Sequence, residues 1–148
     1  MRSSTLLTAL LTISVASFAG AMDTPANAQP KPVIQIPKGI AGTWVGKSTT
    51  GLKDSVITTT TLVATADGKG WTEKLGDRVA MPVRILAAGG DSVVMEVGPY
   101  ASILRPGVQV TTRSVTHFKG DNSWGTFQAN YANAYRDVLK GKTSATRK

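Results

Sequence analysis

From Gly42 onward the sequence consists of short runs rich in Val, Ile and Thr, and glycine-containing pairs separate several of these runs. Apolar and polar residues alternate within them; in the run 79–87, for example, three apolar residues share the face opposite Arg84. A period of two is typical of a strand with one buried face, and no segment keeps the 3.6-residue period of an amphipathic helix. The sequence therefore predicts an all-β domain.

Eight strands are expected in this domain. Their ranges are Gly42 to Thr50, Asp54 to Thr65, Gly70 to Leu75, Val79 to Ala87, Asp91 to Val97, Val108 to Lys119, Asn122 to Tyr131 and Tyr135 to Arg147. The pairs Asp67-Gly68, Gly89-Gly90 and Gly120-Asp121 suit tight hairpin turns, so neighbouring strands should pair antiparallel in chain order, as a meander. Closing this up-and-down meander into a barrel removes both exposed edges; an open two-sheet β-sandwich is the alternative.

One long connection distinguishes the two ends of this barrel. Alternate connections of a meander lie at the same end, and the three tight turns are the second, fourth and sixth connections. The long segment 98–107 is the fifth connection, so it lies at the other, open end. Pro99 and Pro106 restrict its backbone, and Pro106-Gly107 suits the centre of a type II turn. We therefore expect a loop of defined shape at the open end.

The N-terminal residues 1–28 have the pattern of a cleaved secretory signal peptide. An uncharged, largely apolar stretch follows Arg2, and its apolar part, 6–18, is shorter than the ~20 residues of a membrane-spanning helix. Small residues allow cleavage after Ala28, which we favour, or after Ala21. The sequence thus predicts a secreted or periplasmic protein.

Two further segments are expected after the signal peptide. Residues 29–41 include the proline-containing stretch QPKPVIQIPKG and should form an extended arm, and residues 42–148 should form a single β-barrel domain. The chain has no cysteine, so disulfides and thiolate metal sites are excluded. Export without disulfides is a combination that suggests a bacterial protein.

The chain is basic, with a formal net charge of +8, and part of the excess lies at its end. The segment 136–148 contains Arg136, Lys140, Lys142, Arg147 and Lys148 but only one acidic residue, Asp137. Such a cluster can attract an anionic envelope polymer or a membrane surface. The simpler interpretation is a solvated strand whose lysines keep the edge soluble. We expect no specific nucleic-acid partner.

The inventory of chemically active residues favours a non-catalytic protein. His117 is the only histidine, and it is expected on an exposed strand face. Neither a metal site nor a Ser-His-Asp triad can be assembled from these residues, so no metal or cofactor is expected. Asp54, Glu73, Asp77, Asp91 and Glu96 could pair across strands for acid-base chemistry, but most lie near predicted turns. An enzyme that uses polar residues at the open end is kept as an alternative.

Tryptophan positions add a family resemblance. Gly42-Thr43-Trp44, at the start of the first strand, resembles the G-x-W motif of lipocalins and other calycins, and Arg147 resembles the arginine that packs on that tryptophan. The resemblance implies a lipocalin-like barrel in which Trp44 and Arg147 have a structural role. Trp71 and Trp124 begin strands just after tight turns and are expected to fill the closed end.

Small inward-facing residues predict a cavity in the open half of the barrel. If Trp44 points inward, so does Ser48, and the last strand offers small residues on the same side. Walls that mix hydroxyl and aliphatic groups suit a small amphipathic ligand. The expected ligand contacts from open-end connections are Arg78, Tyr100, Arg105 and Tyr135, with Arg105 favouring an anionic or carbonyl-bearing group. The sequence thus predicts a secreted lipocalin-like binding protein; the alternative is an envelope-surface protein that uses its basic C-terminal strand.

Overall fold

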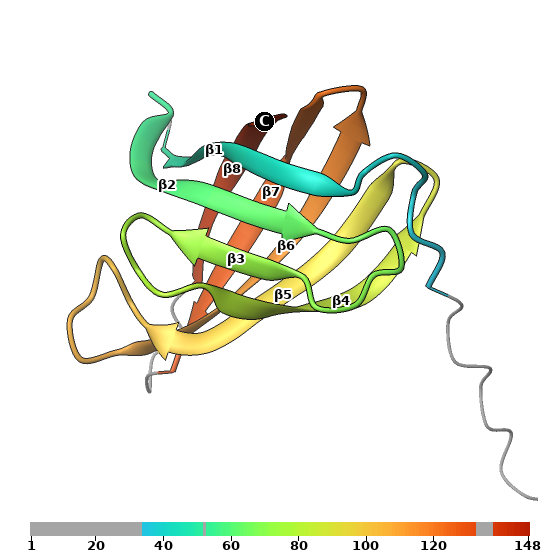
Figure 1. The fold of residues 1–148 in the computed structure, drawn as a ribbon. Coiled ribbons are helices and arrows are strands. Elements are labelled where there is room, and N and C mark those ends of the chain that lie inside the picture. Colours follow the sequence, from blue (N-terminus) through green and yellow to red (C-terminus); the bar gives the residue numbers. More distant parts are fainter. Residues whose placement is uncertain (1–33, 52, 133–137) are drawn as a thin grey trace, which may run out of the picture. The chain divides into compact units, whose positions relative to one another are not determined.

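The computed structural model describes residues 34–51, 53–132 and 138–148, and within these ranges all regular structure is β-strand (Figure 1). The strands are β1 (Gly42–Thr50), β2 (Ser55–Ala64), β3 (Thr72–Leu75), β4 (Met81–Gly89), β5 (Ser92–Ala101), β6 (Gln109–Lys119), β7 (Asn122–Tyr131) and β8 (Val138–Arg147). All of them belong to one unit, residues 31–148. The described residues contain no helix with the length and apolarity to span a membrane. The expected signal peptide lies outside these ranges.

The strands form a closed barrel. Each strand pairs antiparallel with the next in the chain, and β8 pairs with β1 from Trp44 opposite Arg147 to Thr50 opposite Gly141. The predicted up-and-down barrel is therefore confirmed, and the open sandwich is excluded. The expected turn at Gly120-Asp121 is also present, because β6 ends at Lys119 and β7 begins at Asn122. Gly120 has a φ of 59°, a left-handed conformation that glycine adopts without strain.

Strand β5 is longer than the sequence predicts. It continues past Val97 as far as Ala101, and a register shift between Val97 and Tyr100 separates its two halves. A Cβ atom at Gly98 would lie 2.8 Å from the Val110 carbonyl oxygen, so glycine allows the close approach of β6 at this irregularity. The first four residues of the expected loop 98–107 are therefore strand, and the true β5–β6 loop is shorter.

A cluster of aromatic and aliphatic side chains fills the tight-turn end of the barrel. Its buried members are Ile40, Trp44, Leu62, Ala64, Trp71, Val93, Met95 and Phe118. Trp44 and Phe118 meet edge to face with ring centroids 5.0 Å apart, and the Trp71 indole N–H donates to the Thr65 carbonyl at 3.0 Å. A second cluster, built around Val110, Phe127 and Tyr131, lies toward the other end. The barrel interior therefore has two packed clusters, and residues of both line the space between them.

The C-terminal half of the expected arm packs on the closed end. Only its residues 34–41 are described, and Ile40 is 3% exposed within the first cluster. Ile36 packs against the same cluster, and the Gln35 N–H donates to the Ala88 carbonyl at 3.4 Å. These residues therefore contribute to the plug of this barrel end.

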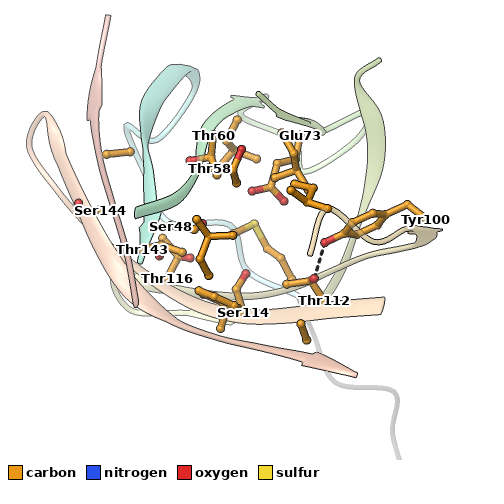
Figure 2. Close-up of a pocket in the computed structure, with 18 of the residues that line it drawn as sticks. Ser48, Thr58, Thr60, Glu73, Tyr100, Thr112, Ser114, Thr116, Thr143 and Ser144 are labelled. Carbon is orange, nitrogen blue, oxygen red and sulfur yellow. Dashed lines mark hydrogen bonds between the residues drawn. The ribbon is translucent and has the colours of Figure 1, made fainter. Parts of the chain in front are cut away.

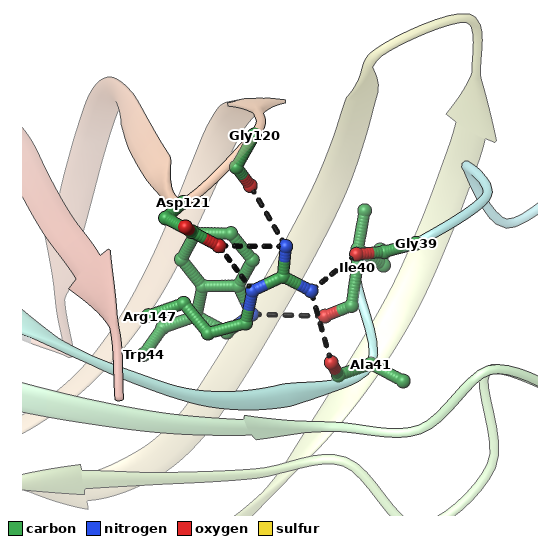
Figure 3. Close-up of polar contacts among 7 residues, drawn as sticks. All are labelled: Gly39, Ile40, Ala41, Trp44, Gly120, Asp121 and Arg147. Atoms are coloured by element: carbon green, nitrogen blue, oxygen red, sulfur yellow. Dashed lines mark hydrogen bonds and ion pairs between the residues drawn. The ribbon is translucent and has the colours of Figure 1, made fainter.

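Trp44 and Arg147 meet at the seam between β1 and β8, as expected (Figure 3). The Arg147 guanidinium lies 5.1 Å from the centroid of the Trp44 ring, and the Trp44 indole N–H donates to the Ile40 carbonyl at 2.9 Å. The guanidinium also donates to Asp121 Oδ1 at 2.9 Å and to the carbonyls of Gly39 at 2.6 Å, Gly120 at 3.1 Å and Ala41 at 3.4 Å. One side chain thus ties β8 to the arm and to the β6–β7 turn.

Trp124 does not fill the closed end, which corrects the sequence-based expectation. It is 45% exposed on the outer wall and stacks on His117, with ring centroids 5.8 Å apart. The reason is alternation: the buried Ser123 takes the inward position at the start of β7, so its neighbour must point outward. Trp71, by contrast, is 1% exposed in the plug, as predicted.

Candidate functional site

A cavity of about 90 Å³ lies inside the barrel (Figure 2). Trp44, Leu62 and Met95 line it on the side of the closed-end plug. The β5–β6 loop contributes Ser102 and Leu104 at the opposite side. A cavity with mixed hydroxyl and aliphatic walls is what the alternation from Trp44 predicted.

Serine and threonine hydroxyls form most of the polar wall. Ser48 from β1, Thr60 from β2 and Thr143 from β8 all line the cavity (Figure 2). The Tyr100 hydroxyl lies 2.7 Å from Thr112 Oγ1, so these two groups satisfy each other. Thr143 Oγ1 is buried and has no hydrogen-bond partner among the described residues. Because an unpaired buried hydroxyl costs about 1 to 3 kcal/mol, a polar group inside the cavity would stabilise this wall.

Glu73 is the one acidic residue among the described residues that line the cavity. It lies on β3 between the buried Trp71 and Leu75, and the three share the inward face because alternate residues of a strand point the same way. Figure 2 shows its carboxylate directed toward the middle of the cavity. Burial raises the pKa of Glu73 from its usual 4.5 to about 7, without an opposing hydrogen bond from another described residue.

The sequence contains a signal for the inward position of Glu73. Glu73 was grouped with other acidic residues of strands and turns as a candidate for acid-base pairing. The pattern Trp-x-Glu-x-Leu over residues 71–75, however, places the carboxyl group on the face of two large apolar residues. Because Trp71 is expected in the interior, the same alternation would place Glu73 there as well.

The β5–β6 loop has the defined shape that its prolines predicted. Ser102 Oγ accepts hydrogen bonds from the N–H groups of Leu104 at 3.1 Å and Arg105 at 2.9 Å. The Val108 N–H donates to the Arg105 carbonyl at 3.2 Å, and Gly107 between them has a φ of 79°. This is the expected type II turn, with Pro106 and Gly107 at its centre.

Three of the four expected ligand contacts gather around this loop, and the fourth, Tyr135, lies outside the described residues. Tyr100 lines the cavity, and its pKa is raised chiefly by burial. Arg78, in the β3–β4 connection, donates hydrogen bonds to the backbone carbonyls of Ala101 and, at 3.4 Å, of Ser102. The Arg105 guanidinium lies 4.3 Å from the centroid of the Tyr131 ring. The two arginines therefore border the loop and are not among the residues that line the cavity.

The described residues offer little for metal or triad chemistry. Within the described ranges, no three His, Asp or Glu side chains lie close enough together to hold a metal ion. His117 is paired with Asp91 on the outer wall, with Nδ1 and Oδ1 3.2 Å apart, and it is not part of the cavity lining. The arrangement is therefore suited to holding a molecule by apolar contacts, hydroxyls and a single carboxyl group.

No protein-family model, curated protein or solved structure matches this chain. The fold is therefore assigned from the pairing of its strands. The protein is an eight-stranded antiparallel β-barrel closed between β1 and β8. This arrangement is consistent with a lipocalin-like barrel, in which eight strands enclose either packed side chains or one small ligand.

Proposed function

We propose that this protein is a non-catalytic, lipocalin-like binding protein that holds a small amphipathic molecule inside its barrel. The observation that carries the proposal is the cavity of about 90 Å³, whose largely apolar walls also carry the Thr143 hydroxyl, which is buried without a hydrogen-bond partner among the described residues. Small-molecule sites combine mainly apolar walls with a few placed polar groups. This cavity is smaller than the roughly 300 to 1,000 Å³ of a drug-sized pocket, so it suits a short molecule and not a long lipid.

The ligand would enter past the β5–β6 loop. Tyr100 would contact it inside the cavity, and Arg78, Arg105 and Tyr135 would contact its outer part at the mouth. A guanidinium at this rim favours a carbonyl-bearing or anionic group on that outer part. Secretion or transfer to the periplasm, which the signal-peptide pattern of residues 1–28 supports, would expose the barrel to small molecules outside the cytoplasm.

Native mass spectrometry of the protein purified from its own host tests the proposal. We expect an additional small mass on the folded protein. Replacing Tyr100 and Arg105 together by alanine should remove this mass, and it should lower the melting temperature to some extent because Tyr100 packs against the second cluster. Trp124→Ala, which removes an aromatic ring from the outer wall, is the matched control and should retain the mass. A double variant that unfolds, yet whose folded fraction still retains the mass, would show that the loop is structural.

A second candidate function rests on the outer face of β8. Lys140 and Lys142 are exposed there and alternate with the less exposed Leu139, Gly141 and Thr143. A hollow on the same outer wall is lined by Arg113, Val115, Thr126 and Lys140, among others. Two cations and an apolar group on one wall support binding of an anionic envelope polymer or membrane surface.

A further inference from the structure

The charge of the cavity is opposite to the charge of the chain. The protein has a formal net charge of +8, yet Glu73 is the one Asp, Glu, Lys, Arg or His among the described lining residues. Arg78 and Arg105, which border the β5–β6 loop, have other partners: Arg78 donates to two loop carbonyls, and Arg105 lies over the Tyr131 ring. The interior is therefore negative whenever Glu73 is ionised.

The neighbours of Glu73 accept hydrogen bonds or attract cations. Thr58 and Thr60 of β2 line the cavity on the Glu73 side in Figure 2, and hydroxyl oxygens accept hydrogen bonds from an ammonium group. Four aromatic residues, Trp44, Tyr100, Phe127 and Tyr131, also line the cavity. Aromatic faces attract cations, with the largest effect where water is excluded.

Among the described residues that line the cavity, none supplies a cation to the Glu73 carboxylate. The described cavity-facing residues of β2 are uncharged, and β4 contributes no residue to the lining. Among the described residues, the titratable groups whose charges act on Tyr100 are Glu73, Tyr131 and Arg78, and Arg78 is the cation of the three. A buried carboxylate without a partner is costly, so the folded protein gains from a cation that enters the cavity.

We propose that the cavity selects a small primary amine in its ammonium form, with the Glu73 carboxylate as its counter-ion and the Thr58 and Thr60 hydroxyls as further acceptors. This inference rests on the proposed binding function and specifies the chemical class of the ligand. An ammonium group offers three donors, and the aliphatic part of the molecule would contact Leu75 and Phe127. An anionic group would meet a like charge at Glu73, so it belongs only at the outer rim near Arg105.

Proton release is a second consequence of this pairing. An ammonium group next to Glu73 favours its ionised form, so binding should lower the pKa of Glu73 from about 7. At pH 6.5, where the carboxyl group of the free protein is mostly protonated, binding of the cation should release a fraction of a proton to the buffer. A neutral ligand that only fills the space would release none.

Titration with three probes of equal length tests the inference: n-butylammonium, n-butanol and n-butyrate, each followed by NMR chemical shifts at pH 8. We expect butylammonium to bind about tenfold or more tightly than butanol, since a hydrogen bond to a charged group exceeds a neutral one, and butyrate to bind least. Calorimetry at pH 6.5 in two buffers of different ionisation enthalpy measures the released protons.

Glu73→Gln keeps the shape of the side chain and should reduce butylammonium binding to the level of butanol. Asp77→Asn removes the same charge from the exposed β3–β4 connection and should preserve the wild-type preference. If wild-type protein binds butanol or butyrate as tightly as butylammonium, the amine inference is wrong while the small-molecule proposal stands. If none of the three probes binds, both are wrong. These rankings use wild-type protein and so do not depend on the folding of a variant.

Discussion

Among single residues, Glu73 and Thr143 have polar groups that the described part of the fold does not pair. Both line the same cavity, from β3 and from β8. Arg147, by contrast, donates to one carboxylate and three carbonyls. Thr143 Oγ1 is the one buried side-chain polar atom without a partner among the described residues, and such atoms are uncommon in folded proteins. Its position beside the same cavity as the partly buried Glu73 supports the proposed binding site.

The raised pKa of Glu73 predicts a pH-dependent stability. Between pH 4.5, its usual pKa, and about 7 the folded protein binds more protons at this site than the unfolded chain. The free energy of unfolding should therefore fall by about 2 to 3 kcal/mol as pH rises through this window, and Glu73 should add no further change above it. Urea denaturation at pH 5 and pH 8, without ligand, measures the difference.

Glu73→Gln should remove most of that difference, because glutamine does not titrate. Asp77→Asn serves as the control and should leave the difference in place. The lowered pKa of Asp67 acts in the opposite direction but below pH 3.8, outside this window. Equal pH dependence in wild type and Glu73→Gln would show that the carboxyl group is well solvated in the folded protein.

At the scale of elements, the β1–β8 seam decides whether the meander closes. Gly46 lies opposite Ala145 in this seam, and a Cβ atom at Gly46 would overlap the Ser144 carbonyl oxygen and the Ala145 side chain. The backbones of the two strands approach closely here, and Trp44 and Arg147 meet two residues before Gly46 on β1 and two residues after Ala145 on β8. Glycine is therefore needed at this point for closure.

Gly46→Ala should lower the free energy of unfolding by about 1 to 3 kcal/mol or more, as expected when an added methyl group has no room. Urea denaturation monitored by tryptophan fluorescence measures the change. Gly89→Ala is the matched control, because a Cβ atom at Gly89 meets nothing within 4 Å and should change stability little. Equal stability of the two variants would show that the pairing of β1 with β8 tolerates an added methyl group at Gly46.

The alternation of apolar and polar residues and the turn-forming residue pairs predicted the architecture. They did not predict side-chain direction at irregular positions of the strands. The bounds of β1 and β7 match the prediction because alternation and tight turns delimit both strands. The end of β5 was placed too early at Val97, because the prolines of the following segment indicated a loop while backbone pairing with β6 continued to Ala101. Arg78 was expected at the open end, but its bonds to loop carbonyls depend on contacts that sequence spacing does not encode.

In the whole molecule, positive charge is carried by the outside of the barrel. Lys47, Lys140 and Lys142 are exposed on β1 and β8, and Lys142 Nζ lies 3.2 Å from Asp54 Oδ1 in an exposed ion pair. Exposed pairs of this kind contribute little to stability and are screened by salt. If the exterior binds an anionic surface, as proposed for the second candidate function, that binding should be sensitive to salt.

Retention on a heparin matrix should therefore depend steeply on salt. We expect the wild-type protein to elute at higher ionic strength than a variant in which Lys140 and Lys142 are both replaced by glutamine. A control that replaces Lys38 and Lys69, which are exposed near the closed end, by glutamine changes the net charge equally and should elute closer to wild type. If the two double variants elute together, retention follows net charge alone and the outer face of β8 is not a binding surface.

The plug formed by Trp44, Trp71, Phe118 and Ile40 has a consequence for how this barrel can diversify. The larger of the two buried clusters lies at this end, and the exposed loop residues that would meet a ligand lie at the other. Substitutions of exposed residues at the mouth should thus avoid much of the penalty that substitutions in the plug incur. Descendants of this chain can exchange one ligand preference for another by changing a few rim residues, with the same barrel inherited intact.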